Sequence, residues 1–109
     1  MGDALWTLEH IYTSLQDSLD DMLMACPSQV ERDIVMSKYV AARENYWNCI
    51  KKAFHDDDPA VQALVAEGKA DIDAIKKINE SLGDITKVID TITHAVSVGS
   101  KIAGKVIAL

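Results

Sequence analysis

The feature that most constrains this chain is a long series of apolar residues separated alternately by three and four positions. The spacing continues without a slip over the last third of the 109-residue chain. Apolar side chains at these intervals lie on one face of an α-helix, whereas a half-buried strand would alternate every second residue. The pattern therefore predicts helices that bury one stripe against other helices. The positions are Ile75, Ile78, Leu82, Ile85, Ile89, Ile92, Val96, Gly99, Ala103 and Val106.

Two earlier segments have the same spacing. The first predicted helix ends at Pro27, because the residue before a proline is pushed out of the α region. A second helix is predicted from about residue 29 to 54, and it begins with a capping box in which Glu31 reaches back to the amide of Ser28. The apolar positions are Leu5, Leu8, Tyr12, Leu15, Leu19, Met22 and Cys26 in the first segment, and Val35, Tyr39, Ala42, Tyr46, Cys49 and Ala53 in the second.

The rest of the chain allows two architectures, which differ at Gly83. A third helix begins at Asp58-Pro59, an N-cap followed by a proline suited to the first helical position. Gly83 and Asp84 offer a C-cap and an N-cap that would divide this segment into two helices. One unbroken helix over 59–107 would instead extend roughly 73 Å, and half of it would have no partner within the chain. We therefore predict an all-α antiparallel four-helix bundle; the alternative is three helices with one long C-terminal helix that dimerises.

Length and charge restrict the possible classes of protein. A chain of 109 residues with 49% hydrophobic residues fits a single helical domain over 1–109. The net charge of −6 and the lack of a basic stripe argue against a nucleic-acid partner. The acidic start Met1-Gly2-Asp3 does not resemble a signal peptide, and no apolar stretch is long enough to cross a membrane. The expected location is the cytoplasm.

No group of residues indicates catalysis, a cofactor or a metal. Cys49 lies about 34 Å from Cys26 along an unbroken helix, too far for a disulfide, so both are expected to be buried small hydrophobes. The run 55–58 is interpreted as a solvated turn, because consecutive aspartates diverge and do not surround a cation. His10 and His94 lack the Glu-x-x-His spacing of di-metal bundles. The protein is therefore expected not to be an enzyme.

Helical stripes without chemistry indicate an interaction protein. The predicted function is a protein–protein interaction or self-assembly module, with a protein partner or a homo-oligomer in which a dimer is favoured. If the last segment supplies part of the interface, Asp in place of Ile102 should dissociate the oligomer and leave most of the helix intact. Trp6 and Trp47 lie beside the apolar stripes and are candidate interface aromatics. The candidate interface residues are Trp6, Trp47, Val98, Ile102 and Val106.

A membrane-active protein is the alternative function. Residues 94–109 contain Lys101 and Lys105, no acid and an apolar face, a composition typical of helices that lie on a bilayer. Two lysines contribute only about 2 kcal/mol at an anionic surface, and the net charge of −6 is repelled by the same surface. A membrane partner is therefore not favoured, and we expect no binding to anionic vesicles at neutral pH.

Overall fold

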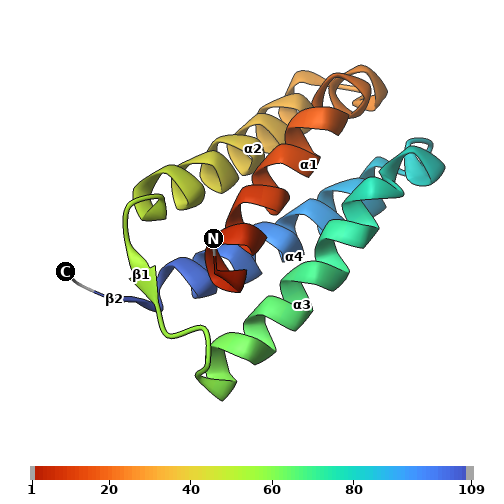
Figure 1. The fold of residues 1–109 in the computed structure, drawn as a ribbon. Coiled ribbons are helices and arrows are strands. Elements are labelled where there is room, and N and C mark those ends of the chain that lie inside the picture. Colours follow the sequence, from red (N-terminus) through yellow and green to blue (C-terminus); the bar gives the residue numbers. More distant parts are fainter. Residues whose placement is uncertain (1, 108–109) are drawn as a thin grey trace.

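Four α-helices form an antiparallel bundle in the computed structural model, which describes residues 2–107 (Figure 1). The bundle confirms the predicted fold and excludes one long C-terminal helix. Helices α1 and α4 each contact all three other helices, whereas α2 and α3 pack mainly against α1 and α4. The helices are α1 (Asp3–Ala25), α2 (Gln29–Cys49), α3 (Pro59–Lys76) and α4 (Ile85–Ala103).

The chain reverses direction between α3 and α4, in the region where the break was predicted. The helix α3 ends at Lys76, and a 3-10 turn, η1 (Ile78–Ser81), follows it. The Asp84 carboxylate then accepts a hydrogen bond of 3.2 Å from the backbone amide of Lys87 and caps α4. Gly83 does not have a positive φ, so it is not the left-handed C-cap that was predicted. The predicted N-cap at Asp84 is confirmed, whereas α3 ends at Lys76 and not at Gly83.

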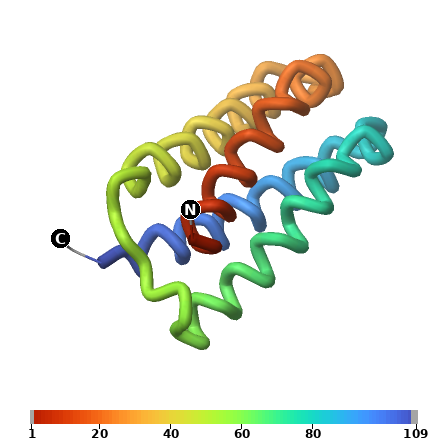
Figure 2. The backbone as a smooth tube through the Cα atoms, viewed as in Figure 1, coloured from red at the N-terminus to blue at the C-terminus, as the bar shows by residue number. Residues whose placement is uncertain are grey.

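The end of α2 differs from the prediction. This helix ends at Cys49 instead of continuing to residue 54. Ala53–Phe54 forms a short strand, β1, that pairs antiparallel with β2 (Val106–Ile107). The pairing holds the connection between α2 and α3 against the chain that follows α4 (Figure 2). A two-residue strand leaves no detectable period in a sequence, and the apolar residues continue the helical spacing.

The helix starts are capped partly as predicted. Asp58 accepts a hydrogen bond of 2.8 Å from the amide of Ala60, which confirms the predicted start of α3. The prediction of a capping box at the start of α2 was wrong. The Ser28 hydroxyl donates a hydrogen bond to the Glu31 carboxylate and accepts none from the backbone amides of the first turn. The start of α1 is capped from a distant position: Asp56 accepts a hydrogen bond of 2.9 Å from the amide of Ala4.

The buried stripes agree with the predicted ones on α2 and only in part on α4. The buried residues of α2 are all predicted positions: Val35, Tyr39, Ala42 and Cys49. In α4, Ile92 is buried as predicted, but Ile85 and Ile89 are only half-buried, and Val88 and Ala95 are buried in their place. Each helix packs against two or three neighbours, so its buried stripe is wider than a two-helix seam and is centred between the neighbours. The 3-4 spacing predicts the helices correctly but does not by itself locate the centre of the buried face.

Helices α1 and α3 approach each other closely at Gly68. A Cβ atom at this position would lie 2.5 Å from the methyl group of Thr7. Thr7 is fully buried, and its hydroxyl donates a hydrogen bond of 2.7 Å to the carbonyl oxygen of Asp3. A side chain on Gly68 would therefore force the two helices apart.

The observed register predicts different energetic effects for two isoleucines of α4. Ile92→Ala should lower the free energy of unfolding by about 2–5 kcal/mol, because it removes a fully buried side chain. Ile89→Ala is the matched control and should cost clearly less, because Ile89 is half-buried. Denaturant unfolding followed by circular dichroism measures both values. Equal losses would contradict the register of α4.

Candidate functional site

Two of the predicted interface residues lie in the protein's own core. Val98 and Ile102 are fully buried in a cluster that also contains Val61 and Val65 of α3. The prediction that they contact a partner was wrong, because α1 and α3 already cover this part of α4. The sequence showed that these residues belong to an apolar face but not which helix covers that face.

Burial of Ile102 changes the expected effect of its substitution. Ile102→Asp should unfold the bundle instead of dissociating an oligomer, because a charge would be buried without a partner. Thermal unfolding followed by circular dichroism should show a large loss of melting temperature or no folded state. A variant with native helicity and an unchanged melting temperature would contradict the structure of the core.

Two other predicted interface residues are partly covered by their own chain. Val106 is half-buried in β2, opposite Phe54. Trp6 is half-buried and stacks on His10, with 3.9 Å between the ring centroids, and the ammonium group of Lys69 lies 5.4 Å from the Trp6 ring. Neither residue offers a broad apolar surface.

The remaining predicted residue, Trp47, belongs to an apolar surface on α2. The side chain of Trp47 is 54% exposed, and those of Met36 and Ile50 are 38% and 46% exposed. Together with Val40 and Arg43 they follow a 4-3-4-3 spacing and therefore lie along one side of the helix. We call this surface the α2 stripe; it consists of Met36, Val40, Arg43, Trp47 and Ile50.

Arg43 is held in the stripe by aromatic rings. Its guanidinium carbon lies 4.8 Å from the centroid of Trp47 and 5.6 Å from that of Tyr39. The Arg43 Nε is buried and has no hydrogen-bond acceptor among residues 2–107. Within this part of the chain, neither Arg43 nor Glu44 makes an ion pair. The stripe therefore combines an exposed aromatic residue with a fixed cation that lacks an anion.

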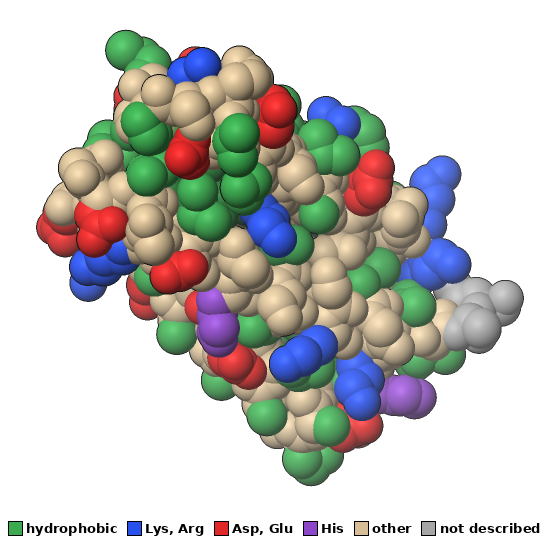
Figure 3. All heavy atoms as spheres, turned by 180° about the vertical axis from the view of Figure 1, so that it is seen from behind, with side chains coloured by type: hydrophobic (Ala, Val, Ile, Leu, Met, Phe, Trp, Pro, Cys, Tyr) green, Lys and Arg blue, Asp and Glu red, His purple; other side chains and the backbone are tan. Residues whose placement is uncertain are grey.

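A shallow groove runs beside the stripe. Its volume is about 470 Å³, and its charged side chains are both acidic. The lining residues are Asp33, Met36, Ser37, Val40, Ala41 and Glu44. Hydrophobic side chains are also visible on the face opposite to that of Figure 1, where charged side chains separate them into groups (Figure 3).

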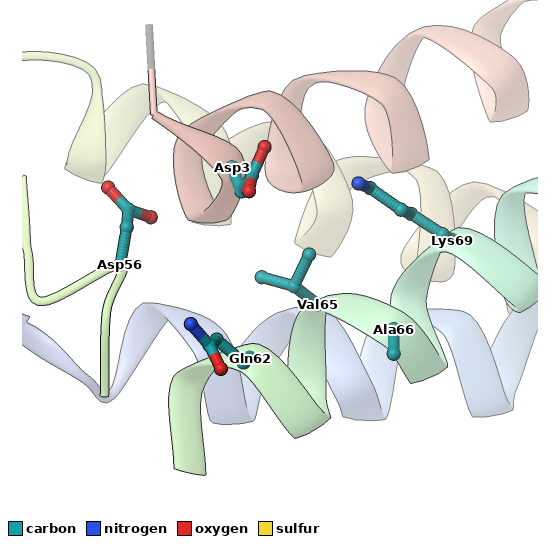
Figure 4. Close-up of a pocket in the computed structure, with 6 residues that line it drawn as sticks. All are labelled: Asp3, Asp56, Gln62, Val65, Ala66 and Lys69. Atoms are coloured by element: carbon teal, nitrogen blue, oxygen red, sulfur yellow. The ribbon is translucent and has the colours of Figure 1, made fainter. Parts of the chain in front are cut away.

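A second cavity, of about 250 Å³, lies where the start of α1 meets α3 (Figure 4). Asp56 lies at one end of this cavity and Lys69 at the other. Asp56 belongs to the predicted solvated turn, but it is half-buried and caps α1 through the amide of Ala4. Its position is thus explained by the fold. No group of three His, Cys, Asp or Glu residues in the described part of the chain is arranged to hold a metal ion.

His94 connects two carboxylates of α3, an arrangement that sequence reasoning missed. Its Nδ1 lies 2.6 Å from Asp71 Oδ1, and its Nε2 lies 3.3 Å from Glu67 Oε1. Asp71 is buried, and its Oδ2 has no partner within residues 2–107. Burial raises the pKa of Asp71, while the hydrogen bond and charge of His94 act in the opposite direction. His94 lies on α4, whereas Glu67 and Asp71 lie on α3, so no spacing within one helix could reveal these contacts.

The raised pKa makes Asp71 a source of pH-dependent stability. The folded protein binds a proton at Asp71 at a higher pH than the unfolded chain does, so stability is present below the ordinary Asp pKa and is lost as pH rises through the folded-state value. Asp71→Asn resembles the protonated form and should raise the melting temperature at neutral pH.

The difference from wild type should vanish near about pH 3, where Asp71 is protonated in the folded and the unfolded state. Glu67→Gln is the matched control, because it neutralises an exposed carboxylate on the same histidine and should raise the melting temperature less than Asp71→Asn does. A lower melting temperature for Asp71→Asn at neutral pH would contradict the interpretation.

The two cysteines have the expected surroundings. Cys26 and Cys49 are free and buried, as predicted, and burial raises the pKa of both thiols. A raised pKa reduces the fraction of reactive thiolate at neutral pH. Their surroundings are those of small core residues.

Comparison with known proteins identified no relative: no family model, no curated protein and no solved structure matches the chain. No helix in the described part of the chain is both long and apolar enough to cross a membrane.

Proposed function

We propose that this protein is a non-enzymatic interaction module that binds another protein through the α2 stripe. The observation that carries the proposal is the half-exposed ring of Trp47, in line with the exposed side chains of Met36 and Ile50. Tryptophan, methionine and arginine are enriched at protein interfaces, and buried tryptophans often supply most of the binding energy. The stripe contains all three residue types on one side of a helix.

The other groups of polar residues favour binding over catalysis. His94 is held between Glu67 and Asp71, and it lines neither the groove beside the α2 stripe nor the cavity at the start of α1. The cavity at the start of α1 contains Asp56, which caps that helix. The contacts of His94 and Asp56 with neighbouring residues therefore give both side chains a role in the fold.

The membrane-active alternative has less support. It requires the apolar face of α4 to leave the bundle and contact a bilayer, and that face includes the fully buried residues Ile92, Val98 and Ile102. Release would cost the hydrophobic stabilisation of both core clusters. The α2 stripe, in contrast, is accessible without any change in the fold.

Affinity capture from an extract of the cells that express the protein tests the proposal. Wild-type protein should retain a partner that Trp47→Ser loses, because the substitution removes the exposed aromatic side chain of the stripe. Met24→Ser is the matched control; Met24 is 85% exposed on α1, lies outside the stripe and should not affect capture. Circular dichroism should confirm that both variants are folded. Capture of the same proteins by wild type and Trp47→Ser would contradict the proposed surface.

A further inference from the structure

Two unpaired charges of opposite sign lie on either side of the centre of the α2 stripe. Successive residues of an α-helix are separated by about 100° of rotation. Arg43 and Glu44 therefore fall on opposite sides of the line through Val40 and Trp47. Glu44 is exposed, and neither charge has an ion-pair partner among residues 2–107. The surface thus carries a cation on one flank, apolar side chains in the centre and an anion on the other flank.

This arrangement is complementary to itself under one particular symmetry. A twofold axis parallel to α2 places two copies of the helix side by side in the same direction and brings opposite flanks together. Arg43 of each copy then faces Glu44 of the other, and the Val40 and Trp47 side chains meet in the centre. An antiparallel pair would bring equal flanks together, so that Arg43 would face Arg43 and Glu44 would face Glu44. Like charges would disfavour that arrangement.

The surroundings of Arg43 prepare it for such a contact. Its guanidinium group lies over the rings of Trp47 and Tyr39, and it makes no ion pair within residues 2–107. A side chain that is already held in place loses less conformational entropy when it forms an ion pair. A carboxylate from outside the chain would supply the missing anion.

We infer that the partner bound by the α2 stripe is a second copy of this chain, in a parallel twofold dimer with two reciprocal Arg43–Glu44 ion pairs. The inference rests on the proposed function and names the partner for the same surface. One helix pair buries less area than a standard interface, so the dimer should be weak, with a dissociation constant on the order of micromolar.

Sedimentation equilibrium of the full chain over a range of concentrations tests the dimer. Wild type should dimerise. Arg43→Glu and Glu44→Arg should each weaken association by on the order of tenfold or more, because each substitution occurs twice in a twofold interface and disrupts both ion pairs. An equimolar mixture of the two variants should associate again, since each supplies the charges that the other lacks. The double variant, with both charges exchanged, should also recover. Lys87→Glu is the matched control: it makes the same charge change as Arg43→Glu on an exposed residue of α4 and should leave the dimer intact.

Several results would overturn the inference. A wild-type protein that is monomeric at every concentration would exclude the second copy, and so would variants that associate like wild type or a mixture that fails to recover. If Arg43→Glu does not fold, Glu44→Arg alone still decides, because Glu44 is exposed and its substitution leaves the contacts of Arg43 with the rings in place. A monomeric wild type whose capture of another protein depends on Trp47 would overturn the dimer but support the proposed function. The proposed function fails as well only if that capture is absent.

Discussion

Burial of the apolar face of α4 is the interaction on which the rest of the bundle depends. This helix contacts the other three, and its residues contribute to both core clusters. The fully buried Ile92 and Ile102 show how closely the neighbouring helices cover it. Because this face is already covered, neither a partner nor a bilayer can reach it without loss of the core. The accessible apolar surface lies on another helix.

That surface lies on α2, which packs with one side against α1 and α4 and leaves the α2 stripe partly accessible. The stripe combines Trp47 with a cation that is fixed by aromatic rings, and an exposed carboxylate follows it in the sequence. Contacts between distant segments hold the end of the bundle near the chain termini together. Asp56 caps α1, and β1 pairs with β2 beyond α4. The proposed interaction surface is therefore carried by a framework that contacts between distant segments hold together.

The helices and some of their caps could be predicted because both depend on residues close together in the chain. Asp58 and Asp84 each accept a hydrogen bond from a backbone amide within three residues. The candidate site was predicted only at Trp47, because an aromatic residue beside an apolar stripe is visible in a sequence. Val98 and Ile102 were misassigned, since their exposure depends on which helices pack over them. The link from His94 to Asp71 was missed for the same reason.

The sequence by itself determined that this chain forms amphipathic helices, because apolar spacing and capping are local properties. It favoured a break near Gly83 but left one long helix as the alternative. The tertiary structure decided that break, the register of the buried face of α4, the close approach of Gly68 to Thr7 and the pairing of Phe54 with Val106. These features depend on the direction from which a neighbouring helix or strand approaches. Only the packing of all four helices sets that direction, and with it the surface of α2 that stays exposed.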